Sequence, residues 1–179
     1  MPGYRCEKIC ISKKVTENII RREMTTVEAK IKSIVEQMEG VTYIFENWAT
    51  ANVKLDNVSL PAVLNVLPAS GTFNLGKTQL KDYPYCMIAF IDKSDLDFDG
   101  TENDGIIERC KNLAKEFILR LNTSDLFEPV DGDILYSVIY DKLDVNVTGI
   151  VIEAQLKESR GLIICPGKDI GEMVHGRKG

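Results

Sequence analysis

Histidine is almost absent from this chain, and its cysteines have no recognisable spacing. The one histidine, His175, lies in a glycine-containing tail, and the five cysteines are odd in number and scattered. Cys6 and Cys10 have neither the spacing of a zinc site nor that of a redox motif. Buried free thiols explain such cysteines best. The sequence therefore argues against a Cys/His metal site and against a cysteine–histidine nucleophile.

Long apolar runs and an excess of positive charge are also absent. No run approaches the roughly 18 residues that a membrane helix needs, and the N-terminus has no apolar segment of signal-peptide length. The net charge is −5. Binding to a phosphate backbone depends on lysine and arginine contacts, so an acidic chain makes nucleic acid an unlikely main partner. We expect no membrane partner, no direct nucleic-acid readout, and assembly in a cytosol.

A catalytic constellation is the third absence. No serine, cysteine or lysine is visibly paired with a base. The acidic pairs Asp131/Asp133 and Asp141/Asp144 fall in expected turns, where aspartate is simply a good turn former. We therefore predict no catalytic residue, no cofactor-binding residue and no metal ligand, and we expect that the protein is not an enzyme.

What the chain does contain is enough apolar material for one core. It has 179 residues, of which 44% are hydrophobic, and this suits a single domain. Apolar residues recur at helical spacing in residues 101–122, and a capping box at Thr25 and Glu28 predicts a second helix that stops at Gly40. Expected strands are residues 41–46, 61–68, 87–91, 134–140, 147–156 and 162–165.

These elements predict an α+β fold, with a mostly antiparallel sheet and two amphipathic helices packed on one face. Residues 24–165 would form the single α+β domain. Residues 1–23 are expected to be a basic N-terminal extension, and residues 166–179 a mobile C-terminal tail. Residues 69–84 contain glycines and few apolar positions, which is typical of a long hairpin arm or loop.

A phosphate-loop motif lies within this arm, where residues 71–78 read GTFNLGKT. Its fixed positions are Gly71, Gly76, Lys77 and Thr78. Such a loop works only when a strand delivers it and a helix begins at the Lys-Thr pair. Here Pro84 follows before two helical turns can form, and a βαβ unit takes roughly 30 residues. We favour a glycine-kinked hairpin, with a nucleotide-binding protein as an alternative function.

A second motif resembles half of a calcium loop, since residues 95–100 read DLDFDG. Its candidate ligands are Asp95, Asp97 and Asp99. The twelfth position, which should be a bidentate glutamate, is Ile106, so the shell loses two oxygens and any affinity should be weak. Helix capping by Thr101 accounts for the same residues. A weak calcium-binding module is a further alternative.

A family resemblance is carried by the string PAVLNVLPASGTFNLGKTQLKDYPYCMIAFIDKSDLDFDGTENDGIIERCKNLAKEFILRLN, followed by ILYSVIYDKLDVNVTGIVIEAQLKESRGLIIC. These stretches resemble the tail-completion, or tail-terminator, proteins of bacteriophages and prophages. The resemblance covers about residues 24–165 and rests on the order of the elements. It implies a virion structural protein of the tail end or head–tail neck, assembled in the host cytoplasm, typically as a hexameric ring that contacts other tail or connector proteins.

The arm is the expected contact between subunits. Phe73 and Leu75 have no predicted strand or helix to bury them, so they are candidate residues of an oligomer interface. Trp48, at the expected end of the first strand, is either a core indole or a further interface anchor. The leading hypothesis is therefore a homo-oligomeric ring of virion structural subunits.

Overall fold

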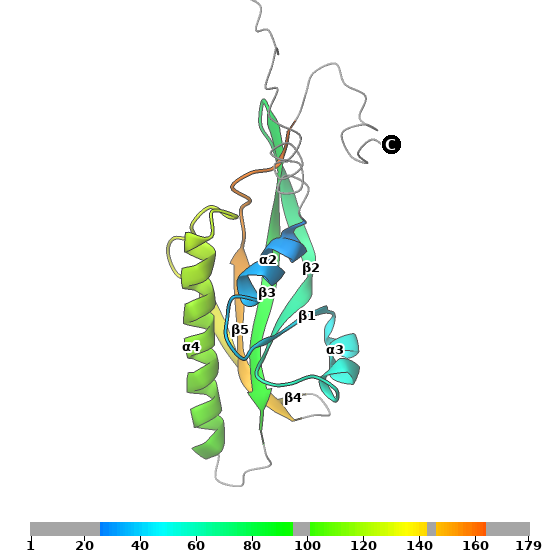
Figure 1. Ribbon diagram of the computed structural model, residues 1–179, viewed down its shortest axis with the longest axis vertical. Helices are drawn as coiled ribbons and strands as arrows, with labels where there is room; N and C mark the ends of the chain where they lie inside the picture. The colour runs from blue at the N-terminus through cyan, green and yellow to red at the C-terminus, as the bar shows by residue number, and fades with distance from the viewer. Residues whose placement is uncertain (1–25, 95–100, 143–145, 164–179) are drawn as a thin grey trace, which may run out of the picture.

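The computed structural model describes residues 26–94, 101–142 and 146–163. Within these residues, three helices and six strands form an α+β domain whose strands belong to one sheet (Figure 1). The helices are α2 (Val27–Val35), α3 (Trp48–Leu55) and α4 (Thr101–Thr123). The strands are β1 (Thr42–Glu46), β2 (Ala62–Leu75), β3 (Gln79–Lys93), β4 (Leu135–Lys142), β5 (Val147–Gln155) and β6 (Leu162–Ile163).

The sheet is mixed, with the strand order β1-β2-β3-β5-β4 and with β6 paired to the far part of β3. The pair β1 and β2 is parallel, and the other pairs are antiparallel. The predicted α+β class and the largely antiparallel sheet are therefore confirmed. The parallel pair was not expected. Two parallel strands cannot be joined by a tight hairpin and need a crossover, and α3 supplies it.

The helix α3 corrects the prediction of two helices. Asn47 caps it, because the Asn47 side-chain oxygen accepts a hydrogen bond of 2.9 Å from the Thr50 amide. Trp48 is consequently the first residue of a helix rather than the end of a strand. Ala51 and Leu55 are buried against the sheet. A helix of eight residues with two buried positions gives too short an apolar pattern to read from sequence.

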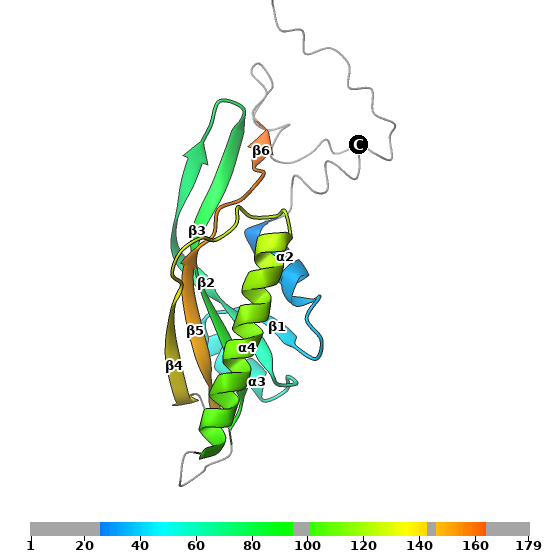
Figure 2. The same cartoon turned by 90° about the vertical axis from the view of Figure 1, so that its left-hand side faces the viewer.

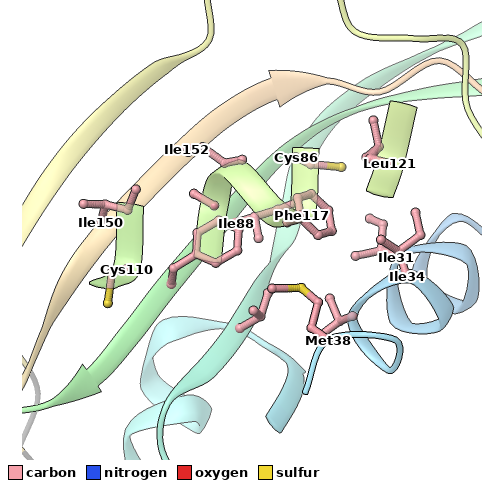
Figure 3. Packing of buried hydrophobic residues seen from close by; sticks show 14 of the residues in the cluster. Ile31, Ile34, Met38, Cys86, Ile88, Cys110, Phe117, Leu121, Ile150 and Ile152 are labelled. Carbon is pink, nitrogen blue, oxygen red and sulfur yellow. The ribbon is translucent and has the colours of Figure 1, made fainter. Parts of the chain in front are cut away.

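As predicted, α2 and α4 cover one face of the sheet. Their apolar stripes meet strands β3 and β5 in one core, part of which Figure 3 shows. The rings of Phe90 and Phe117 lie with centroids 5.7 Å apart. The cap of α2 is Thr26, whose hydroxyl accepts from the Ala29 amide at 3.2 Å, rather than the predicted Thr25.

The opposite face of the sheet is covered by α3 and has its own core. Alternate residues of the strands point to the two faces, so Ile88 and Phe90 join the core beneath α4, while Ala89 and Ile91 join the core beneath α3. The α3 helix packs over the β1 and β2 side of the sheet. This placement leaves part of the sheet face beyond it uncovered.

The hairpin of β2 and β3 continues beyond the helices as a projecting arm (Figures 1 and 2). The predicted second strand stopped at Pro68, but β2 runs on to Leu75, with a register irregularity between Val66 and Ser70. The pairing of β1 with β2 ends at Val66. Pro68 therefore lies where β2 no longer has a partner on that side, a position that proline tolerates.

Candidate interaction surface

The arm, which we define as residues 70–85, is a β-hairpin whose β3 strand also pairs with β6 at Gln79 and Leu80. Its pairing runs from Ser70 opposite Tyr85 to Leu75 opposite Leu80. The turn is closed by a hydrogen bond of 2.9 Å from the Gly76 amide to the Gln79 carbonyl. The expected hairpin arm is therefore present, and its backbone is paired within the single chain.

Two large apolar side chains project from this arm into solvent. Phe73 is 76% exposed and Leu75 is 73% exposed. Both lie on the same face of the ribbon, because they are two residues apart on one strand. The structure thus places these two predicted interface residues together in the outer part of β2, within the hairpin that projects beyond the helices (Figure 1).

The β3 strand of the arm is tied to α2 and to the loops after α4 and β5 by charged groups. The Glu158 carboxylate accepts from Lys30 Nζ at 2.6 Å and from the Asp82 amide at 2.7 Å. Lys81 Nζ donates to Glu128 at 3.0 Å, and this hydrogen bond raises the pKa of Lys81. The side chains of Lys30 and Glu158 are both nearly inaccessible to solvent. Removing one partner of this buried ion pair would leave the other charge unpaired and lower the stability of the fold. These contacts connect the arm to α2 through Glu158.

The second surface is a hollow on the sheet face that α3 leaves uncovered. Its volume is about 370 Å³. We call it the groove, and the residues that line it include Trp48, Val66, Leu67, Tyr85, Met87 and Glu153. Leu67 and Tyr85 are 44% and 54% exposed. The groove is therefore a mainly apolar hollow with a carboxylate at its edge.

Strand register explains how these residues come together. Met87 pairs with Val66 on one side and with Glu153 on the other, so the three side chains form one row across the sheet. Tyr85 begins the next row toward the arm. Leu135 of β4 lies opposite Glu153 and is 78% exposed, which extends the apolar surface to the sheet edge.

Sequence reasoning found Trp48 but missed the rest of the groove. Trp48 is half-buried at the start of α3 and lies in the wall of the groove, away from the arm tip that carries Phe73 and Leu75. Met87 and Glu153 lie in predicted strands and Tyr85 lies outside them, but only the pairing register decides which face each residue shares with its neighbours.

The phosphate-loop motif has the geometry of a hairpin. Gly71 lies in β2, Gly76 and Lys77 lie at the turn, and β3 starts directly after Thr78. No helix begins at Lys77, so the amide cluster and dipole that bind phosphate do not arise there. A Cβ on Gly71 would lie 3.0 Å from the Cα of Pro84. This glycine permits close approach of the paired strand.

The candidate calcium ligands Asp95, Asp97 and Asp99 lie outside the described residues. Elsewhere in the described ranges, no cluster of three or more His, Cys, Asp or Glu side chains could hold a metal ion. The described helices also include none that is long and apolar enough to cross a membrane.

Cys86 and Cys110 are buried free thiols, as predicted for the cysteines in apolar runs. Burial raises the pKa of each to about 12. At neutral pH both are protonated, and a protonated thiol is a poor nucleophile and metal ligand. Desolvation likewise raises the pKa of the Tyr43 phenol, whose oxygen accepts a hydrogen bond from the Asn65 amide at 3.1 Å. The two thiols and the Tyr43 side chain are therefore part of the packed core.

Comparisons of the chain with protein-family models, with curated proteins and with solved structures gave no match.

Proposed function

We propose that this protein is a structural subunit of a bacteriophage or prophage virion, at the tail end or head–tail neck, and that it works by assembling into a homo-oligomeric ring. Its partners would be further copies of itself and neighbouring tail or connector proteins. It would assemble in the host cytoplasm and remain in the virion. The proposal combines the resemblance of residues 24–165 to tail-completion proteins with the surfaces described above.

The projecting arm is the observation that carries the proposal. A chain that acts alone gains nothing from holding Phe73 and Leu75 in solvent on a paired ribbon, since exposed apolar groups of this size favour association. At about 25 cal/mol per Å² of apolar area removed from water, covering two such side chains favours contact by a few kcal/mol. The ion pair between Lys30 and Glu158 helps to preorganise the arm in the free protein. Preorganisation lowers the entropy cost of binding a partner.

The molecule carries two separate surfaces, as a contact between successive copies in a ring requires. The arm and the groove are different surfaces at different places on the same chain. When one surface of each copy contacts a different surface of the next, the contact repeats until the rotation closes. A head-to-tail contact of this kind produces a ring when the rotation closes and an open filament when it does not.

The test uses the double variant Phe73→Asp/Leu75→Asp. We expect the circular dichroism spectrum and melting temperature of the variant to stay close to those of the wild type, because both side chains are already in water. Self-association, measured by sedimentation velocity, should weaken at least tenfold, which corresponds to about 1.4 kcal/mol.

A matched control is available on the other face of the same strand. Thr72 and Asn74 are also exposed, and Thr72→Asp/Asn74→Asp adds the same charge to the same ribbon. We expect this control to assemble nearly as the wild type does. If the Phe73/Leu75 variant unfolds, the arm belongs to the core. If it assembles as well as the control, the arm is not the contact between subunits.

A further inference from the structure

The groove and the arm tip match each other in chemistry. The groove is apolar with Glu153 at its edge, and Glu153 is exposed. The arm tip carries Phe73 and Leu75, and Lys77 is the one charged residue between Ser70 and Gln79. The tip is therefore a cationic apolar element on a chain whose net charge is −5.

The spacing between the two apolar side chains of the arm tip also matches the spacing between the residue rows of the groove. Phe73 and Leu75 are two residues apart on one strand, so their side chains are roughly 7 Å apart. The Tyr85 and Met87 rows of the groove are separated by the same two-residue step along β3. A volume of about 370 Å³ is in the range of sites that enclose groups larger than a single aromatic ring.

A chain cannot place its own arm tip in its own groove. Ser70 and Tyr85 share one face of the ribbon, and alternation puts Phe73 and Leu75 on the other face. The tip also extends away from the groove, since Phe73 is three residues beyond Ser70, or roughly 10 Å along the strand. Folding the arm back would break the paired ladder between β2 and β3. An arm tip that occupies the groove must therefore come from another molecule.

We propose that the groove lined by Trp48, Tyr85, Met87 and Glu153 is the receptor for the arm of a second copy of this chain, with Phe73 and Leu75 inserted and Lys77 paired with Glu153. This inference rests on the proposed ring assembly and names the surface that receives the arm. Charge pairs that lose water at an interface contribute to specificity, and breaking one leaves the other partner unpaired.

The test is a charge exchange between Lys77 and Glu153. Both side chains are exposed, so Lys77→Glu and Glu153→Lys should fold normally, which circular dichroism and melting temperature check. Each single variant should weaken self-association about tenfold in sedimentation velocity, and the double variant should recover to within about threefold of the wild type.

The outcomes separate this inference from the proposed function. If the wild type forms rings and neither charge reversal weakens them, ring assembly stands and the groove assignment is wrong. If Glu153→Lys weakens assembly while Lys77→Glu does not, the groove holds another segment, such as the basic residues 1–23. If both weaken assembly without recovery in the double variant, the arm docks elsewhere. A wild type that stays monomeric contradicts both proposals.

Discussion

Gly149 illustrates how a single residue can decide whether the sheet packs. It lies in β5 opposite Ile91, between β3 and β4. A Cβ at this position would lie 2.0 Å from the Phe90 carbonyl oxygen and 3.0 Å from the Ile91 Cα, both backbone atoms that cannot rotate away. The sequence places Gly149 in a strand, but the close contact depends on the packing of two strands that are distant in sequence.

We therefore predict that Gly149→Ala destabilises the fold by about 1–3 kcal/mol, the usual cost of overpacking. Thermal unfolding followed by circular dichroism should show a melting temperature lower by several degrees. Gly105→Ala is the matched control, because a Cβ there meets no atom within 4 Å. Within helix α4 the added methyl should stabilise by up to about 1 kcal/mol. An unchanged melting temperature for Gly149→Ala would contradict the packing described.

The elements differ in how far local sequence determines them. The α4 helix follows from its three-and-four apolar spacing, and its bounds, Thr101–Thr123, agree with the predicted residues 101–122. A long amphipathic element carries its own pattern. The outer part of β2 carries no such pattern. Residues 70–75 are all exposed, so no alternation of buried and exposed positions marks them as a strand. The parallel pairing of β1 and the faces of the groove residues depend on long-range register.

The phosphate-loop motif also lies in the arm, and its Lys77 is at a hairpin turn rather than at the start of a helix. We predict that ATP with Mg²⁺ at sub-millimolar concentration does not raise the melting temperature of the wild type, and that Lys77→Ala gives the same result. Differential scanning fluorimetry with and without nucleotide checks both. Saturable stabilisation by ATP that disappears in Lys77→Ala would mean that the motif binds nucleotide despite its geometry.

At the scale of the whole molecule, an acidic α+β body carries a cationic apolar arm at one end and an apolar groove on an open sheet face. Among the described residues, neither the arm tip nor the groove is covered by another part of the chain. If each arm enters the groove of the next copy, both surfaces are used once per subunit, and the chain of contacts forms a ring when the rotation between copies closes. In the proposed ring, the number of subunits would follow from the angle between the two surfaces.

The most direct measurement is the mass of the full-length protein in solution across a wide range of concentration, combined with electron micrographs of the same sample. We predict one discrete oligomer above a threshold concentration, with a mass that stays constant as concentration rises further, and ring-shaped particles in the images. A closed ring saturates in this way because its last contact leaves no free arm or groove. A monomer at every concentration, a two-fold dimer or an open filament would contradict the account.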